Sequence, residues 1–152
     1  MKLSSPIQVG LSALAVSISL LGCGSDKDGV TGSSENQVGP APQAIYENWA
    51  KTERYPNGQS KTHTVRFFRD GIAVFNTICA FPSGAVVRAT VQGNVKLTNK
   101  TIEVLTRAKD LQKDANGNEC QCEIEPGKVT YRIAGIQLYV LADDEEVVFT
   151  RQ

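Results

Sequence analysis

Short runs in which apolar and polar residues alternate fill the chain between residues 45 and 152, and no other feature constrains the fold as strongly. Val65 and Phe67 flank a polar residue, and so do Ile102 and Val104. A period of two places successive side chains on opposite faces of a β-strand, so that one face is buried and the other meets water. The segment therefore predicts β-structure almost throughout.

Turn residues divide this segment into strands about every eight to twelve residues, a spacing typical of all-β domains. Asp70-Gly71 is a strong hairpin signal, and Pro126-Gly127 and Asp143-Asp144 mark two further turns. A polar loop is predicted at 109–119, and the one helical pattern lies at 43–51. The predicted strands are, in chain order, 63–68, 72–80, 85–97, 102–106, 120–124, 129–133, 137–141 and 147–151.

Sequential strands joined by short turns favour an antiparallel meander, because parallel strands need long crossover connections. A meander hides its edge strands best by closing on itself. We therefore predict an all-β fold, a single small antiparallel up-and-down β-barrel of about 8 strands, with a β-sandwich as the alternative. The side chains expected to face inward are Val65, Phe67, Val74, Ile102, Val104, Val129, Tyr131, Ile133, Leu138, Val140, Val147 and Phe149.

The first 22 residues have the pattern of a secretory signal peptide. Lys2 precedes an apolar and serine-rich run at 7–21, and the small residue Gly22 stands before Cys23. This run has 15 residues, whereas a membrane-spanning helix needs about 20. A spanning helix, or a cleaved signal followed by an incidental cysteine, is the alternative interpretation.

The sequence Leu20-Leu21-Gly22-Cys23 resembles the lipobox of bacterial lipoproteins. The resemblance implies cleavage after Gly22 and acylation of Cys23 with fatty acids such as palmitate, which anchors the mature chain in a lipid bilayer. Gly24 rather than Asp follows the cysteine, which in Gram-negative lipoproteins resembles the signal for export to the outer membrane. The chain is therefore expected in the cell envelope, and in the outer membrane if the organism is Gram-negative.

Three segments follow from these patterns: a signal peptide at 1–22, a lipidated N-terminus and disordered tether at 23–44, and one β-barrel-like domain at 45–152. The tether is rich in Gly, Ser, Asp and Pro and has almost no large apolar residue. Removing the signal deletes only Lys2 from 16 basic and 16 acidic residues, which leaves a net charge of about −1. This balance argues against nucleic acid as a partner, because such binding depends on Lys and Arg at phosphates.

Trp49 near the start of the folded segment and Arg151 on the last predicted strand resemble a feature of lipocalin-like barrels. In that family an early Trp packs near a late Arg at the closed end of the barrel. Glu47 departs from the family pattern, which usually has Gly two residues before the Trp. The resemblance implies either a cavity for a small apolar ligand or lipid, or a filled barrel. Without it, Trp49 is a core anchor and Arg151 a solvated residue.

If Cys23 carries lipid, an odd number of cysteines remains in an oxidising compartment. We predict a disulfide from Cys79 to either Cys120 or Cys122, with a strained bridge within Cys120-Gln121-Cys122 as another possibility. A metal or redox site is the remaining alternative. It is disfavoured because the spacing lacks the two-residue spacer of zinc knuckles and thiol oxidoreductases, and because His63 is the only histidine.

Residues 112–123 partly match a calcium-binding loop, but Gln112 stands where Asp is expected, so Asn116-Gly117 is interpreted as a simple turn. No catalytic constellation surrounds His63 or any serine. We therefore expect no enzymatic activity, no metal and no cofactor.

The sequence as a whole predicts a membrane-anchored envelope lipoprotein whose lipocalin-like domain binds a small apolar ligand or lipid. The alternative is a non-enzymatic module that binds an envelope protein or has a structural role.

Overall fold

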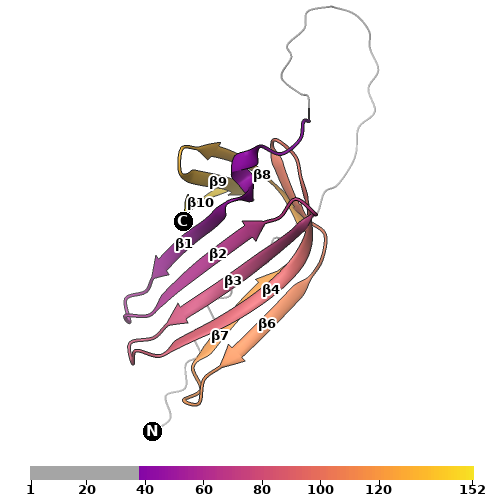
Figure 1. The fold of residues 1–152 in the computed structure, drawn as a ribbon. Helices are drawn as coiled ribbons and strands as arrows, with labels where there is room; N and C mark the ends of the chain where they lie inside the picture. Colours follow the sequence, from indigo (N-terminus) through magenta and orange to yellow (C-terminus); the bar gives the residue numbers. More distant parts are fainter. Residues whose placement is uncertain (1–37) are drawn as a thin grey trace, which may run out of the picture.

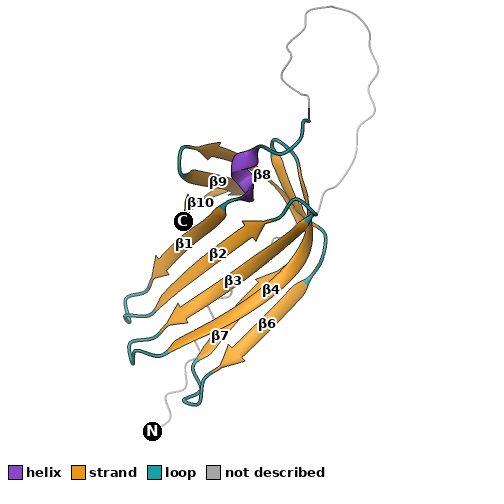
Figure 2. Ribbon diagram, viewed as in Figure 1, coloured by secondary structure: helices purple, strands orange, loops and turns teal. Residues whose placement is uncertain are grey.

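A computed structural model describes residues 38–152, which are almost entirely β-strand and turn. The first element of this part of the chain is a short 3-10 helix, η1 (Gln43–Tyr46). Ten strands follow, as Figures 1 and 2 show: β1 (Asn48–Arg54), β2 (Ser60–Phe67), β3 (Ile72–Ala80), β4 (Val86–Leu97), β5 (Thr101–Val104), β6 (Ala108–Lys113), β7 (Glu119–Ile124), β8 (Gly127–Ala134), β9 (Gln137–Ala142) and β10 (Glu145–Arg151).

Eight of these strands close into an antiparallel barrel in the order β1-β10-β9-β8-β5-β4-β3-β2. Strands that are neighbours in the barrel follow one another along the chain, except where β5 pairs with β8 and where β1 meets β10. The all-β up-and-down barrel predicted from the sequence is therefore confirmed, and the sandwich alternative does not form. The other two strands, β6 and β7, pair only with each other and leave the barrel between β5 and β8.

The barrel closes through a short contact between its first and last strands. β1 pairs with β2 along its whole length. With β10 it pairs at only two positions, where Trp49 lies opposite Arg151 and Ala50 lies opposite Thr150. In Figure 1, β8 to β10 lie together at one end of the long strands β1 to β4. Beyond Ala50 the two strands no longer pair, so within residues 38–152 the rest of β1 is an edge of the sheet.

Side chains fill the interior of the barrel. Trp49, Leu138 and Ile45 are completely buried, and burying a large apolar side chain contributes about 1.5–3 kcal/mol. The indole Nε1 of Trp49 donates a hydrogen bond of 3.0 Å to the backbone oxygen of Ile45, so the polar ring atom is satisfied in the core. The buried members of this central cluster are Ile45, Trp49, Val65, Phe67, Ala73, Val95, Ile102, Tyr131 and Leu138.

Most of the residues expected to face inward do so. The prediction for Val74 is wrong, because this residue lies opposite Arg66 and Gln92 on the outer face of the sheet. β3 carries apolar residues on both faces, so its pattern does not decide which face is buried. The confirmed positions are Val65, Phe67, Ile102, Tyr131 and Leu138 within the central cluster, Val104, Val129, Ile133, Val140 and Phe149 packed against it, and Val147, which lies opposite Val140 on the same face.

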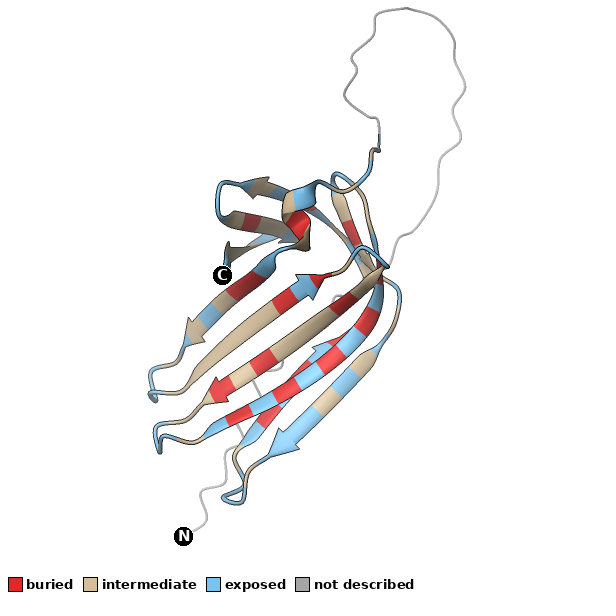
Figure 3. Ribbon diagram, in the orientation of Figure 1, coloured by how far each residue is buried: buried red, intermediate tan, exposed pale blue. Residues whose placement is uncertain are grey.

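The hairpin β6–β7 covers the part of β4 that extends beyond the barrel. β4 alternates buried and exposed residues along nearly its whole length, which appears as regular banding in Figure 3. Val95 belongs to the central cluster, whereas Ala89 and Val91 pack against Cys122 and Ile124 of β7. One face of β4 therefore supports two adjoining cores.

Two sequence predictions of secondary structure are wrong. Residues 109–119 were expected to form a loop, but they include most of β6, whose residues pair with β7. β6 buries little of its own side-chain surface, so its sequence lacks the apolar alternation of a strand. The helical pattern at 43–51 yields only η1, because from Asn48 onward the backbone pairs with β2 instead.

Gly93 allows the hairpin to approach β4 closely where the two cores meet. A Cβ atom at this position would lie 2.5 Å from Cδ1 of Ile124 and 2.9 Å from Oγ1 of Thr106. Ile124 is itself buried among the hairpin residues, so it has little room to move.

The substitution Gly93→Val is expected to lower the free energy of unfolding by about 1–3 kcal/mol, because the added side chain overpacks the contact with Ile124. Chemical denaturation of both proteins measures the difference. Gly127→Val on β8 is a matched control, since a Cβ atom there meets nothing within 4 Å. Equal losses in the two variants would contradict this account of the packing.

Candidate functional site at the open edge of β1

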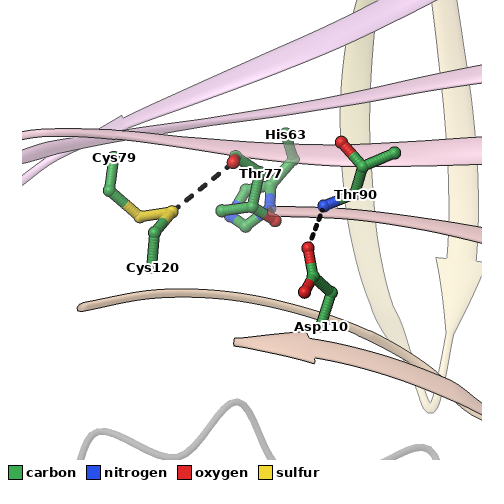
Figure 4. The surroundings of a disulfide bond; sticks show 6 residues. All are labelled: His63, Thr77, Cys79, Thr90, Asp110 and Cys120. Atoms are coloured by element: carbon green, nitrogen blue, oxygen red, sulfur yellow. Dashed lines mark hydrogen bonds between the residues drawn. A yellow bond between two sulfur atoms is a disulfide. The ribbon is translucent and has the colours of Figure 1, made fainter. Parts of the chain in front are cut away.

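Cys79 on β3 and Cys120 on β7 form a disulfide, with their Cα atoms 5.7 Å apart. This is one of the two pairings that the sequence favoured, and the other candidate, Cys122, is buried with a free thiol. Figure 4 shows how the bridge fastens the hairpin to the sheet. The sulfur of Cys120 also lies 3.4 Å from the backbone oxygen of Thr77. This is a van der Waals contact and not a hydrogen bond, because a disulfide sulfur carries no hydrogen. Burial raises the pKa of the Cys122 thiol, which keeps it protonated.

The other residues that the sequence singled out fall at separate places. Trp49 and Arg151 face each other at the closure of the barrel, where Trp49 is buried and Arg151 is exposed. Cys23, the predicted lipidation site, lies outside the described residues. In the stretch 112–123, which partly matches a calcium-binding loop, Asp114 begins the β6–β7 turn, where its carboxylate accepts hydrogen bonds from the backbone N–H groups of Asn116 and Asn118. Among residues 38–152, no cluster of three or more His, Cys, Asp or Glu side chains is arranged to hold a metal.

The two edges of the long sheet β1 to β4 differ. At the β4 edge, the backbone N–H of Thr90 donates to Oδ2 of Asp110 over 2.8 Å, as Figure 4 shows. A second amide of the same edge, that of Asn94, donates to Oγ1 of Thr106 over 3.0 Å. The side chains of Thr106 and Asp110, which come after β5 in the chain, therefore accept hydrogen bonds from the edge of β4. On the side of β1 that faces away from β2, no strand of the described region pairs with the stretch from Lys51 to Arg54.

The direction of the backbone groups along β1 is fixed by its two neighbours. On the β10 side, the N–H of Gln152 donates to the backbone oxygen of Asn48 over 2.9 Å. On the β2 side, the N–H of Tyr55 donates to the backbone oxygen of Gln59 over 2.8 Å. Backbone groups alternate between the two sides of an antiparallel strand. The N–H and C=O groups of Thr52 and Arg54 therefore point toward the open edge.

A hollow of about 570 Å³ lies beside this edge, where β1 and β10 diverge. Its walls carry hydroxyl, amide and amine groups as well as apolar ones. The strand edge is thus accessible from outside rather than covered by the barrel. The residues that line the hollow are Ala50, Lys51, Thr52, Thr62, Val148, Thr150 and Gln152.

The inner face of β1 beside the edge is charged. Nζ of Lys51 lies 2.8 Å from Oε1 of Glu53, and the hydroxyl of Tyr55 donates to Oε2 of Glu53 over 2.9 Å. The ammonium group of Lys61 lies 5.9 Å from the centre of the Tyr55 ring. The hydrogen bond from Lys51, and then that from Tyr55, lower the pKa of Glu53 against the effect of burial. We call Lys51, Glu53, Tyr55 and Lys61 the charged inner cluster.

His63 lies between this cluster and the covered part of the sheet. It stands opposite Lys51 on β1 and opposite Thr77 on β3, and its Nδ1 lies 3.2 Å from Oγ1 of Thr77. Its Nε2 is buried without a hydrogen-bond partner in the described region. Burial, the largest effect, lowers the pKa of His63, while Glu53 opposes that shift. The hydroxyl beside His63 cannot act on a substrate, because Thr77 is only 2% exposed.

Sequence reasoning did not single out Lys51, Thr52 or Glu53. The sequence does contain a signal for them: Lys51 and Glu53 follow Trp49 at intervals of two residues, so both charged side chains lie on the same inner face of the strand as Trp49. Inward-pointing charges are typical of edge strands.

Comparison of this chain with family models, with curated proteins and with solved structures finds no match. Within residues 38–152, no helix has both the length and the apolar character needed to cross a bilayer. The functional argument therefore depends on the residues and on the geometry of the β1 edge.

The depressed pKa of His63 predicts a loss of stability on acidification. Because the folded pKa is below the ordinary value of about 6.5, the unfolded chain binds the proton more readily, and stability falls as the pH drops below that value. We expect the free energy of unfolding to fall between about pH 7.5 and pH 5.5. His63→Gln should remove most of this change, since the carboxylates titrate at lower pH. An identical pH dependence in the variant would contradict the assignment.

Proposed function

We propose that this chain is a lipid-anchored bacterial envelope protein whose barrel domain recognises another protein, without enzymatic activity, by adding a strand of that protein to the open edge of β1. The single observation that carries the proposal is the accessible stretch from Lys51 to Arg54, where backbone groups point at a hollow. A strand that docks there gains main-chain hydrogen bonds, and its side chains provide specificity.

The lipid anchor is supported by the lipobox resemblance at Leu20-Leu21-Gly22-Cys23. Two or three acyl chains hold a protein stably in a bilayer, since each buried methylene contributes about 0.8 kcal/mol. An anchored domain needs no further membrane contact, which leaves its strand edges available for protein partners.

The contrast between the two sheet edges supports strand addition. Natural sheets protect their edges with side chains, loops or covering elements, because an open edge pairs with other chains. Asp110 and Thr106 occupy the edge of β4 in this way. The charged inner cluster disfavours pairing of the β1 edge with arbitrary apolar strands, since such a strand places apolar side chains against the half-buried Lys51–Glu53 ion pair. Selective rather than general pairing is the expected result.

Crosslinking in cells tests the proposal. A photoreactive amino acid in place of Thr52 is expected to form an adduct with an envelope protein, whereas the same residue in place of Arg88, on the outer face of β4, is not. Arg54→Pro should abolish the adduct at position 52, because proline removes a donor that points toward the partner while sparing the β2 ladder. Arg54→Ala is the matched control and should retain it. An adduct that survives Arg54→Pro in a folded protein would rule out strand addition.

Binding of a small apolar ligand is the second candidate function, and one observation favours it. A hollow of about 700 Å³ lies beside η1, where Pro42, Ala44 and Ile133 supply apolar surface. This arrangement suits the apolar chain of a fatty acid, which can lie against these residues. The filled interior of the barrel makes this surface hollow the favoured place for such a ligand.

Calorimetric titration of the lipidated protein with palmitate measures this second function. If the hollow beside η1 is the site, Ala44→Phe should fill part of it and weaken binding by about tenfold or more, the effect of losing roughly 1.4 kcal/mol of contact. Thr62→Phe, which fills the hollow beside β1 instead, should leave palmitate binding unchanged. Equal effects of the two variants would exclude the η1 hollow.

A further inference from the structure

The open edge of β1 is blocked at one end. β10 occupies the same side of β1 at Trp49 and Ala50. A strand that pairs with Thr52 and Arg54 and then continues past Lys51 meets β10, because the place opposite Ala50 is already filled by Thr150. The available edge is therefore a slot with one closed end, and a bound strand has to stop there.

The charges along the slot are ordered. Lys51 lies next to the closed end, and Glu53 lies one strand repeat farther out on the same inner face. Both are half-buried, with their side chains 34% and 27% exposed, so an approaching charge is only partly screened by water. A complementary strand carries negative charge at its end and positive charge two residues earlier.

From this closed end and this order of charges we propose that the β1 edge binds the free carboxyl terminus of a partner protein, in antiparallel register with β1. This inference rests on the proposed function of strand addition and specifies which part of the partner is bound. An antiparallel strand approaches from the Arg54 side and ends beside Lys51, so its terminal carboxylate lies at the cation. A parallel strand would place an ammonium terminus there, next to a like charge.

The register follows from the backbone. The N–H and C=O groups of Thr52 exchange hydrogen bonds with the penultimate residue of the partner, since residues that share both bonds lie directly opposite each other. The last residue of the partner then lies opposite Lys51, and the residue two before the last lies opposite Glu53. Thr52, Thr62 and Thr150 line the hollow and offer hydroxyl groups to polar side chains on the outer face.

Specificity is therefore expected for a carboxyl-terminal sequence with a basic residue two positions before the end. The terminal residue faces the inner side, and the penultimate residue faces the hydroxyl-lined hollow. The acetylated peptide Thr-Val-Thr-Lys-Thr-Val with a free carboxyl end meets these requirements and serves as the probe.

Fluorescence polarisation with the lipidated protein in detergent micelles tests the proposal with three forms of this peptide. The free acid is expected to bind at least about tenfold more tightly than its carboxyl-terminal amide, because only the acid places a charge beside Lys51. A third form, with Ala-Ala added after the terminal Val, should also lose at least tenfold, because it runs into β10. Equal binding of all three forms would overturn the inference.

Charge reversal in the protein provides the matched controls. Lys51→Glu should remove the preference for the acid over the amide. Glu53→Lys should weaken binding of the Lys-containing peptide and strengthen binding of the peptide in which that Lys is replaced by Glu. Circular dichroism verifies that each variant is folded, which is expected because both side chains are partly exposed.

The outcomes separate this inference from the proposed function. If Arg54→Pro abolishes binding of all three peptides while acid and amide bind equally, strand addition stands and recognition of a carboxyl terminus is wrong. If wild type binds none of the peptides at millimolar concentration, yet the photoreactive residue at position 52 forms an adduct through an internal segment of a partner, the inference is likewise overturned. Absence of both peptide binding and the adduct would remove the two proposals together.

Discussion

The closure of the barrel at Trp49 is the contact on which the rest of the structure depends. Only two residue pairs join β1 to β10, and one of them contains Trp49, which is completely buried and hydrogen-bonded to Ile45. The large apolar ring anchors both the entry of the chain and its last strand to one core. Because the strands diverge just beyond it, the same contact that closes the barrel also creates the open edge. Closure and accessibility are therefore two consequences of one geometry.

The hairpin β6–β7 explains why only one edge of the sheet is open. It packs on the inner face of β3 and β4, is tied to β3 by the Cys79–Cys120 disulfide, and supplies Asp110 to the edge of β4. Nothing in the described region gives β1 similar cover. The inner face there is instead polar, with Lys51 and Glu53 paired and the pKa of His63 lowered by burial. Beyond the closure, the long strands thus carry an apolar core on β3 and β4 and a charged surface on β1 and β2, which act as a scaffold and a binding edge.

The alternation of apolar and polar residues, together with the short turns, was sufficient to predict a closed antiparallel barrel. Each strand of such a barrel buries one face and exposes the other, which produces a period of two in the sequence. It failed for Val74, whose strand is apolar on both faces, and for β6, whose pairing rather than its burial makes it a strand. The spacing of Cys79 and Cys120 restricted the disulfide but did not select it, since Cys122 shares the same face of β7. The edge residues Lys51 and Thr52 were not found, because whether a strand is an edge depends on where its neighbours stop. The lipobox at Cys23 and the absence of enzymatic activity stay predictions.

The central claim is that β1 offers unpaired backbone groups on one side, and amide hydrogen exchange measured by NMR tests it most directly. In the isolated protein, the amides of Lys51 and Glu53 should exchange slowly because they bond to β2, whereas those of Thr52 and Arg54 should exchange rapidly. Addition of a binding peptide should slow the exchange at Thr52. Uniformly slow exchange from Lys51 to Arg54 in the isolated protein would show that the edge is already covered and would contradict the account.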